Sequence, residues 1–348
     1  MPTPLRELTT LRLGGPPRRL VETGTEAELV AAVREADAGQ PVLVLAGGSN
    51  VVVADEGFPG TVVRVLSRGI ERCDADGRIV LTAQAGEPWE PFVERCVDEG
   101  LAGVESLAGI PGSIGATPIQ NVGAYGQEVA EIVTGIRVLD REGDVVEDLP
   151  AAAAGFAYRS SAFKRTPGRW VVLAVTFELE RRALSGPIEY AELARTLSVR
   201  PGEGAPLAEV RDAVLRLRRG KGMVVDPEDP DSVSAGSFFT NPVLEAKAFA
   251  ALEERAGDGA RPPRFPEPDG RVKTSAAWLI ERAGFTRGYG NPDGIAISGK
   301  HTLALVNRGH GTTAELVVLA REIAAGVRER FGVELVPEPV LVGHAWPG

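Results

Sequence analysis

The sequence predicts an α+β protein built from more than one domain, and three observations carry this prediction. The chain has 348 residues, whereas a single hydrophobic core stops growing at about 250–300 residues. Short apolar runs typical of strands occur along most of the chain, and stretches with helical apolar periodicity lie between them. Apolar residues make up 43% and charged residues 25%, which is ordinary for a globular protein.

The N-terminal part of the chain has an α/β pattern. Apolar runs at 41–46 and 61–66 have the composition of buried strands. A helix is expected between Thr25 and Gly39, because Thr25 and Glu28 have the spacing of a capping box and Gly39 is a typical helix terminator.

Strands dominate the region that follows. Alternating or continuous apolar runs predict them at 78–86, 135–148 and 169–180. The middle segment contains the pair Glu142-Gly143 at its centre and is therefore expected to fold as a hairpin.

An amphipathic helix is expected at 207–222. Val210, Val214 and Leu217 form its apolar stripe, and a basic cluster ends it. The segment 222–232 is acidic, rich in proline and without periodicity, so a domain boundary is expected there.

The C-terminal region returns to mixed α and β structure. Helices are expected at 274–284 and 312–332, the second with a Thr-x-x-Glu capping box at its start and a glycine at its end. Strands are expected at 294–298 and 302–307.

Charge and composition exclude several classes of protein. The formal net charge of −10 disfavours a nucleic-acid binder, whose binding domain would be basic. The chain contains no apolar run long enough for a membrane span, and its N-terminus lacks an apolar signal core. Cys73 and Cys96 lack CxxC spacing, which favours a reducing compartment over a disulfide framework. We therefore expect a cytoplasmic protein.

Two glycine-rich segments are candidates for a ligand site. One is LAGGSN at 45–50, directly after an expected strand; the other is GIPGSIGATPIQNVGAYG at 109–126, which carries five glycines and no charge. Glycines allow backbone N–H groups to converge on an anion, and small side chains leave room for a flat ring system. Neither segment has the Rossmann spacing, and the chain lacks a P-loop.

A serine hydrolase and a metal enzyme are both poorly supported. Ser237, in SAGSFFTNP, is not in a nucleophile elbow and has no histidine near it in sequence. A serine without a base is a weak nucleophile but can still donate a proton to a strong base such as a carbanion. The three histidines, His301, His310 and His344, lack metal-ligand spacing, so we expect no metal site.

Five segments in order resemble the UDP-N-acetylenolpyruvoylglucosamine reductase (MurB) family, in its longer, type I form. They are AGGSN, GIPGSIGATPIQNVGAYG, YRSSAFK, AGSFFTNP and a terminal Pro-Glu, and together they span residues 46–338. Each segment alone is modest, whereas five in order are highly specific.

The resemblance implies an α+β fold with two subdomains of the vanillyl-alcohol-oxidase type that bind FAD and a smaller α+β domain that binds substrate. Residues 1–70 and 71–222 would form the FAD-binding subdomains, with a C-terminal tail of about 336–348 returning to the first. Residues 223–335 would form the substrate-binding domain.

The resemblance also implies the reaction. NADPH would reduce FAD, and the enolpyruvyl ether of UDP-N-acetylglucosamine would then be reduced to UDP-N-acetylmuramate. Arg159 and Glu338 match the residues that stabilise the enolate, and Ser237 matches the proton donor to C2. Arginine suits the first role because its guanidinium binds a carboxylate through two parallel hydrogen bonds.

The same motifs imply two sets of binding residues. Those that match the cofactor-binding positions are Gly47, Gly48, Ser49, Asn50, Gly112, Ser113, Ile114, Gly115, Thr117, Asn121 and Gly123. Those that match the substrate-binding positions are Tyr158, Tyr190, Lys221 and Asn241.

Two alternatives remain open from the residues alone. One is another FAD-dependent oxidoreductase of the same superfamily, acting on a hydroxy acid or alcohol, which would have no use for Ser237 together with Arg159 and Glu338. The other is a nucleotide-sugar-binding protein without catalysis, in which the uncharged segment 109–126 is poorly explained. Because no coiled coil or long apolar patch is evident, we expect a monomer.

We predict that FAD is bound non-covalently. Flavin attachment in this fold often uses a histidine of the cofactor domain, and the first histidine here is His301, in the expected substrate domain. Cys73 and Cys96 are the remaining candidates for attachment. Acid precipitation should release all the yellow colour into the supernatant, and colour retained on the washed protein would contradict the prediction.

Overall fold

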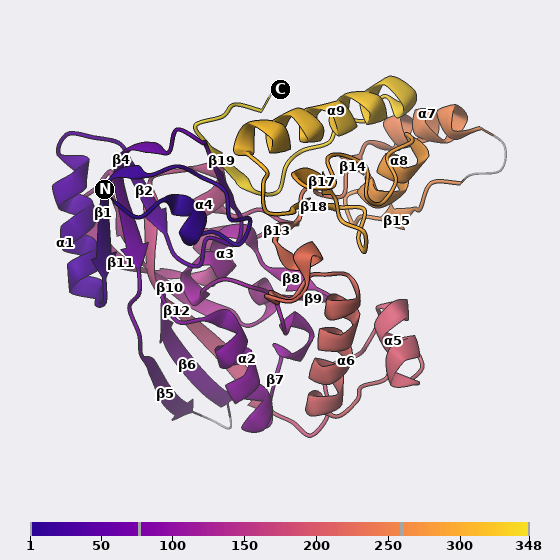
Figure 1. Cartoon of the computed structure of the whole chain (residues 1–348). Coiled ribbons are helices and arrows are strands. Elements are labelled where there is room, and N and C mark those ends of the chain that lie inside the picture. Colours follow the sequence, from indigo (N-terminus) through magenta and orange to yellow (C-terminus); the bar gives the residue numbers. More distant parts are fainter. Residues whose placement is uncertain (1, 76–77, 258–260, 347–348) are drawn as a thin grey trace. The chain divides into compact units, whose positions relative to one another are not determined.

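A computed structural model describes residues 2–75, 78–257 and 261–346 (Figure 1). The chain divides into two compact units, each made of discontinuous segments. The first unit comprises Met1–Thr3, Pro17–Gly48 and Pro59–Gly220, and the second comprises Pro4–Pro16, Ser49–Phe58 and Lys221–Gly348. The last two residues of the expected tail 336–348 lie outside the described residues.

The first unit begins with a small sheet covered by a helix. Its strands lie in the order β1-β4-β2, and β2 runs parallel to β4. The elements are β1 (Pro17–Thr23), α1 (Glu26–Asp37), β2 (Val42–Leu45) and β4 (Phe58–Val65). Leu29 and Val33 of α1 are fully buried in one core with Val63 of β4.

A six-stranded sheet follows in the same unit. Its main path is β11-β10-β12-β6-β5, all antiparallel, and β7 pairs with the far end of β12. The strands are β5 (Ile70–Ala75), β6 (Arg78–Gln84), β7 (Leu101–Ala102), β10 (Val133–Asp140), β11 (Val145–Pro150) and β12 (Trp170–Arg181).

Helices and short strands complete this unit. They are α2 (Trp89–Asp98), α3 (Thr117–Gln120), β8 (Gly123–Ala124), β9 (Gln127–Glu128), α4 (Ala162–Arg165), α5 (Ala191–Leu197) and α6 (Leu207–Gly220). Single 3-10 turns lie at Glu105–Leu107, Ile114–Ala116, Val129–Glu131 and Ala151–Ala154.

The described residues of the second unit form three small sheets: β13-β18-β17, β14-β16-β15 and the parallel pair β19-β3. Its strands are β3 (Val51–Val53), β13 (Ser234–Ser237), β14 (Val243–Leu244), β15 (Phe265–Pro266), β16 (Val272–Lys273), β17 (Ile295–Ile297), β18 (Ala304–Asn307) and β19 (Val340–Val342). The helices are α7 (Ala246–Ala256), α8 (Ala276–Arg282) and α9 (Thr313–Phe331), with 3-10 turns at Leu5–Glu7 and Pro230–Ser232.

One core holds the second unit together. Phe238, Phe239, Leu279 and Leu316 are buried in it, and α9 lies along one side of β17 and β18 (Figure 1). Leu11 is also part of this core, although it lies far from the others in sequence.

The helices and strands expected from periodicity are confirmed, while three local details differ. At α1, Thr25 Oγ1 accepts from Glu28 N–H, but Glu28 returns its carboxylate to Gly24 N–H rather than to Thr25. On α6, Val210 and Val214 are fully buried, but the third member of the expected stripe, Leu217, is only half-buried.

The third detail concerns the segment 222–232, which was expected to be a domain boundary without periodicity. It contains the 3-10 turn Pro230–Ser232, and the Asp231 and Ser232 side chains are buried. Burial of these polar residues is possible because each is hydrogen-bonded.

We predict that Leu316→Ala lowers the free energy of unfolding of the second unit by about 2–5 kcal/mol, because truncating a fully buried leucine leaves a cavity. Val318→Ala on the same helix is the matched control, since Val318 is 65% exposed; its effect should stay within about 0.5 kcal/mol. Urea unfolding followed by tryptophan fluorescence measures both, and equal effects would contradict the core described above.

Candidate active site

The two glycine-rich segments meet within the first unit. A Cβ added to Gly47 would lie 2.9 Å from Gly112 Cα, so the two backbones touch where any side chain would intrude. Gly112 also has a positive φ of 125°. In the other segment, Gly48, which follows Gly47, has a positive φ of 59°. These backbone conformations favour glycine because it lacks a Cβ.

Backbone hydrogen bonds hold the longer segment against the sheet. Ile114 N–H donates to Glu87 O at 2.8 Å, and Gly115 N–H donates to Ala85 O at 2.9 Å. A Cβ on Gly115 would lie 2.6 Å from the Ala85 Cβ. The segment 109–126 is therefore fixed in place and does not move freely as a loop. We call the segments 45–50 and 109–126 together the glycine-rich bed.

Two buried polar groups in this bed lack a hydrogen-bond partner among the residues that the structure describes. They are the Ser113 hydroxyl and the Gln120 amide nitrogen, on side chains only 4% and 8% exposed. A buried polar group normally has a partner, so a ligand with polar atoms fits here. FAD meets that requirement, since its phosphates and ring edges carry both acceptors and donors.

The expected cofactor residue Asn121 is engaged inside the protein. It sits at φ 44°, its amide nitrogen donates to Glu128 Oε2 at 2.7 Å and to Ala157 O at 3.0 Å, and its oxygen accepts from Ala130 N–H. The Thr117 hydroxyl likewise donates to a backbone oxygen within its own turn. Both side chains therefore hold the shape of the segment.

Arg159 lies beside this segment in the first unit. It has φ 50°, and its Nη2 donates to Gly123 O at 2.5 Å. The guanidinium carbon lies 5.4 Å from the centre of the Tyr158 ring. Lys164 Nζ donates to the Arg159 carbonyl at 3.1 Å, which supports the strained backbone from the other side. The structure thus positions Arg159 through several contacts, as a preorganised cation requires.

A buried arginine that sequence reasoning missed lies in the same unit. Arg218, on α6, is 9% exposed, and burial lowers its pKa to about 10, so that it remains charged at neutral pH. Tyr125 shares this environment, and burial raises its pKa to about 12. The signal was present in the sequence: Arg218 follows Val210 and Val214 at helical spacing and therefore continues the buried stripe.

Tyr190 joins this group. Its ring packs edge-on against Tyr125, with centroids 5.2 Å apart and the planes at 84°. It is 45% exposed, at the start of α5. Tyr125 therefore lies between the partly exposed Tyr190 ring and the buried charge of Arg218.

Ser237 and Glu338 are neighbours in the second unit. Ser237 ends β13, and the next residue, Phe238, accepts a hydrogen bond at 2.8 Å from Glu338 N–H. Asn50 Nδ2 donates to the Glu338 carbonyl at 3.4 Å. Two expected catalytic residues and one expected cofactor residue therefore lie together, although they are up to 288 positions apart in sequence.

Three other expected residues, Ser49, Lys221 and Asn241, lie in the second unit. Asn241 Oδ1 accepts from Ala276 N–H at 3.0 Å, so this amide also holds the start of α8. Lys221 is half-buried and begins the segment Lys221–Gly348 of the second unit. Ser49 begins another segment of that unit, Ser49–Phe58.

Comparisons with known proteins find similarity along almost the whole chain. A family model described as an FAD binding domain matches residues 17–148, and a model described as the C-terminal domain of UDP-N-acetylenolpyruvoylglucosamine reductase matches residues 228–342. UDP-N-acetylenolpyruvoylglucosamine reductases from Thermobifida fusca and Streptomyces avermitilis are 57% and 56% identical to the chain, over 98% of its length and 97% and 94% of theirs.

A solved structure of the reductase from Thermus caldophilus matches with a TM-score of 0.65 at 26% identity, covering 98% of this chain and 97% of that one. The predicted fold class is therefore confirmed as an FAD-binding fold joined to a smaller α+β domain. Within the described residues, no helix is long and apolar enough to cross a membrane.

We predict that Gly47→Ala weakens FAD binding on the order of tenfold or more, because its Cβ would press on the Gly112 backbone. Gly39→Ala is the matched control, since nothing lies within 4 Å of a Cβ at Gly39. Titration of each apoprotein with FAD, with thermal unfolding as a check on folding, measures the effect. Equal affinities for the two variants would contradict the assignment of this bed.

Proposed function

The chain belongs to the UDP-N-acetylenolpyruvoylglucosamine reductase (MurB) family, and on that premise we propose how its residues carry out the reaction. It is an FAD-dependent oxidoreductase, with UDP-N-acetylmuramate dehydrogenase activity. It reduces the enolpyruvyl ether of UDP-N-acetylglucosamine to the lactyl ether, a step in the synthesis of peptidoglycan precursors.

We also propose the electron donor, the oligomeric state and the cellular compartment of the enzyme. NADPH is the electron donor, the enzyme is a monomer, and it acts in the cytoplasm. The absence of any long apolar helix among the described residues is consistent with the last point, and the acidic composition is consistent with a soluble enzyme.

We propose that FAD is held by the bed that the two glycine-rich segments form. Backbone N–H groups of Gly47, Gly48, Ser49 and Asn50 face its phosphates. The buried Ser113 hydroxyl bonds to the cofactor, which supplies the partner that this group otherwise lacks within the described residues. Gly112, Ile114, Gly115 and Gly123 contribute backbone to the site, and Thr117 and Asn121 fix the shape of the segment.

When bound, FAD supplies the hydride that adds to C3 of the enolpyruvyl group. Negative charge then develops at C2 and spreads into the substrate carboxylate. Arg159 stabilises this charge with its guanidinium and Glu338 acts with it, while Ser237 Oγ donates the proton to C2. The observation that carries this assignment is the backbone hydrogen bond between Glu338 and Phe238, which holds Glu338 beside Ser237. A preorganised donor of this kind is worth about 3 kcal/mol of barrier in other enzymes.

The remaining residues bind the substrate. Tyr158 and Tyr190 offer hydroxyl groups, and Lys221 supplies a positive charge for the diphosphate. Asn241 Oδ1 holds the start of α8, and its amide nitrogen donates to the substrate. The partial exposure of Tyr190 supports its part in this set.

We predict that Ser237→Ala leaves reduction of the flavin by NADPH nearly unchanged and slows its reoxidation by the enolpyruvyl substrate by about 100- to 10,000-fold, the usual range for loss of a general acid. Stopped-flow absorbance of the flavin measures the two half-reactions separately. If both slow equally, Ser237 has a structural role and the assignment is wrong.

A further inference from the structure

A histidine lies beside Ser237 in the second unit, although none is near it in sequence. His301 Nε2 is 3.5 Å from Ser237 Oγ, within the looser range found at catalytic hydrogen bonds before substrate binds. From this geometry, and resting on the proposed role of Ser237, we propose that His301 is a positioning residue for the proton transfer. Its Nε2–H donates to Ser237 Oγ and directs the serine hydroxyl proton toward the substrate.

Pairing within one sheet brings the two side chains together. Ser237 ends β13 and lies opposite Ala304 on β18, and Phe238 N–H donates to Leu303 O at 2.7 Å. His301 stands in the turn between β17 and β18, and its carbonyl accepts from Ala304 N–H at 3.1 Å. The distance between the imidazole and the hydroxyl is therefore set by strand register.

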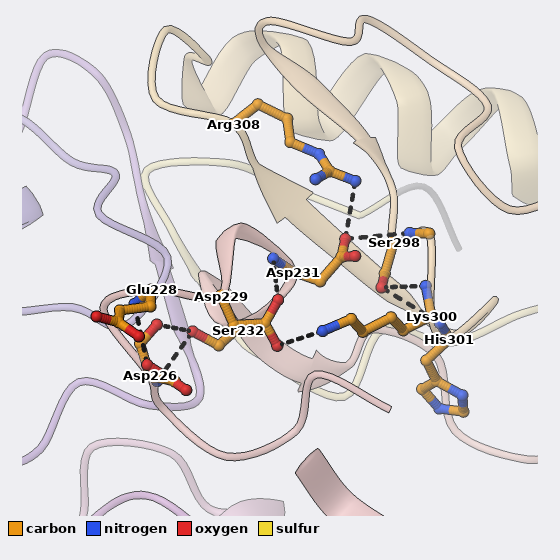
Figure 2. Close-up of polar contacts among 10 residues, drawn as sticks. Asp226, Glu228, Asp229, Asp231, Ser232, Ser298, Lys300, His301 and Arg308 are labelled. Atoms are coloured by element: carbon orange, nitrogen blue, oxygen red, sulfur yellow. Dashed lines mark hydrogen bonds and ion pairs between the residues drawn. The ribbon is translucent and has the colours of Figure 1, made fainter. Parts of the chain in front are cut away.

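The turn itself is fixed from inside. The fully buried Ser298 hydroxyl accepts hydrogen bonds from the backbone N–H groups of Lys300 and His301, at 3.0 and 3.2 Å. Figure 2 shows both bonds converging on the Ser298 hydroxyl. The His301 backbone thus has little freedom, while its half-buried ring projects from the turn.

Two carboxylates anchor the turn from the acidic segment. Asp231 Oδ1 accepts from Gly299 N–H at 3.0 Å and from Arg308 Nη2 at 2.8 Å, and Asp229 pairs with Lys300 Nζ at 2.9 Å (Figure 2). Asp231 is buried, so its ion pair is less screened than an exposed one. These contacts explain why Asp231 is buried, although the rest of its segment is largely exposed.

The chemistry needs a donor at this place. A lone serine hydroxyl is a weak acid, and the alkoxide that remains after proton transfer is costly unless a donor stabilises it. In the proposed step the Ser237 O–H bond breaks as the C2–H bond forms, and the negative charge passes to Oγ. His301 Nε2–H stabilises that charge, and water restores the proton to Oγ before the next turnover.

The proposal requires a hydrogen-bond donor at position 301, whereas a purely structural role would not. His301→Leu should slow reoxidation of the reduced flavin by substrate on the order of 100-fold, the typical cost of removing one such donor. His301→Gln should recover the rate to within about tenfold of wild type, because its amide N–H can still donate. Reduction by NADPH should be unchanged in both. His310→Leu is the matched control, since His310 is exposed and follows β18 on a separate turn.

A double-mutant cycle separates this role from direct contact with the substrate. In the Ser237→Ala background, His301→Leu should change the reoxidation rate by less than about threefold, because the group it acts through is gone. The dissociation constant of the substrate on the oxidised enzyme, read from the shift of the flavin spectrum, should be the same with and without His301→Leu. A weaker affinity, or a full effect of His301→Leu without Ser237, would overturn the proposal.

The outcomes also distinguish this proposal from the one it rests on. If Ser237→Ala slows only reoxidation but His301→Leu has no effect, Ser237 is the donor and His301 does not position it. If Ser237→Ala slows both half-reactions equally, the proton-donor assignment itself fails. If His301→Gln is as slow as His301→Leu while both melt at the wild-type temperature, a hydrogen-bond donor is not what the site needs, and the proposal is wrong.

Discussion

The close approach of Gly47 to Gly112 is the constraint on which the proposed cofactor site depends. Two backbones in contact leave no room for a Cβ, and the adjoining Gly115 is packed against Ala85 in the same manner. Such contacts exclude side chains from the points where the backbones meet. A flat, partly anionic cofactor is the ligand proposed for this place.

Much of the fold was predictable because apolar periodicity determines which face of each element is buried. The helix α9 shows this most clearly: Thr312 and Glu315 form both bonds of the expected capping box, and Gly332 ends the helix at φ 70°. Local chemistry was sufficient here because the residues that determine the helix ends are adjacent in sequence.

What the sequence did not reveal depends on contacts between distant segments. The acidic segment around Asp231 has no local pattern, and its burial follows from partners 68 and 77 positions away. Arg218 belongs to the basic cluster expected at the end of this helix, yet its side chain lies on the buried face of α6, where charged residues are seldom found. The Asn121 side chain is hydrogen-bonded to Glu128, Ala157 and Ala130, and the spacing of its own motif does not predict these partners.

The division of the chain into interleaved segments has a consequence for folding. Leu11 and Leu13 belong to the core of the second unit together with Val52, although the rest of that core is made after residue 221. A fragment that starts at Lys221 would lack these side chains and the strand β3 that pairs with β19. Neither unit can therefore be obtained as one continuous piece of polypeptide. During synthesis, the N-terminal segments of the second unit cannot pack until their partners far along the chain have been made. Contacts of such high sequence separation slow folding, so the nascent chain exposes apolar surface for longer than a chain of contiguous domains would.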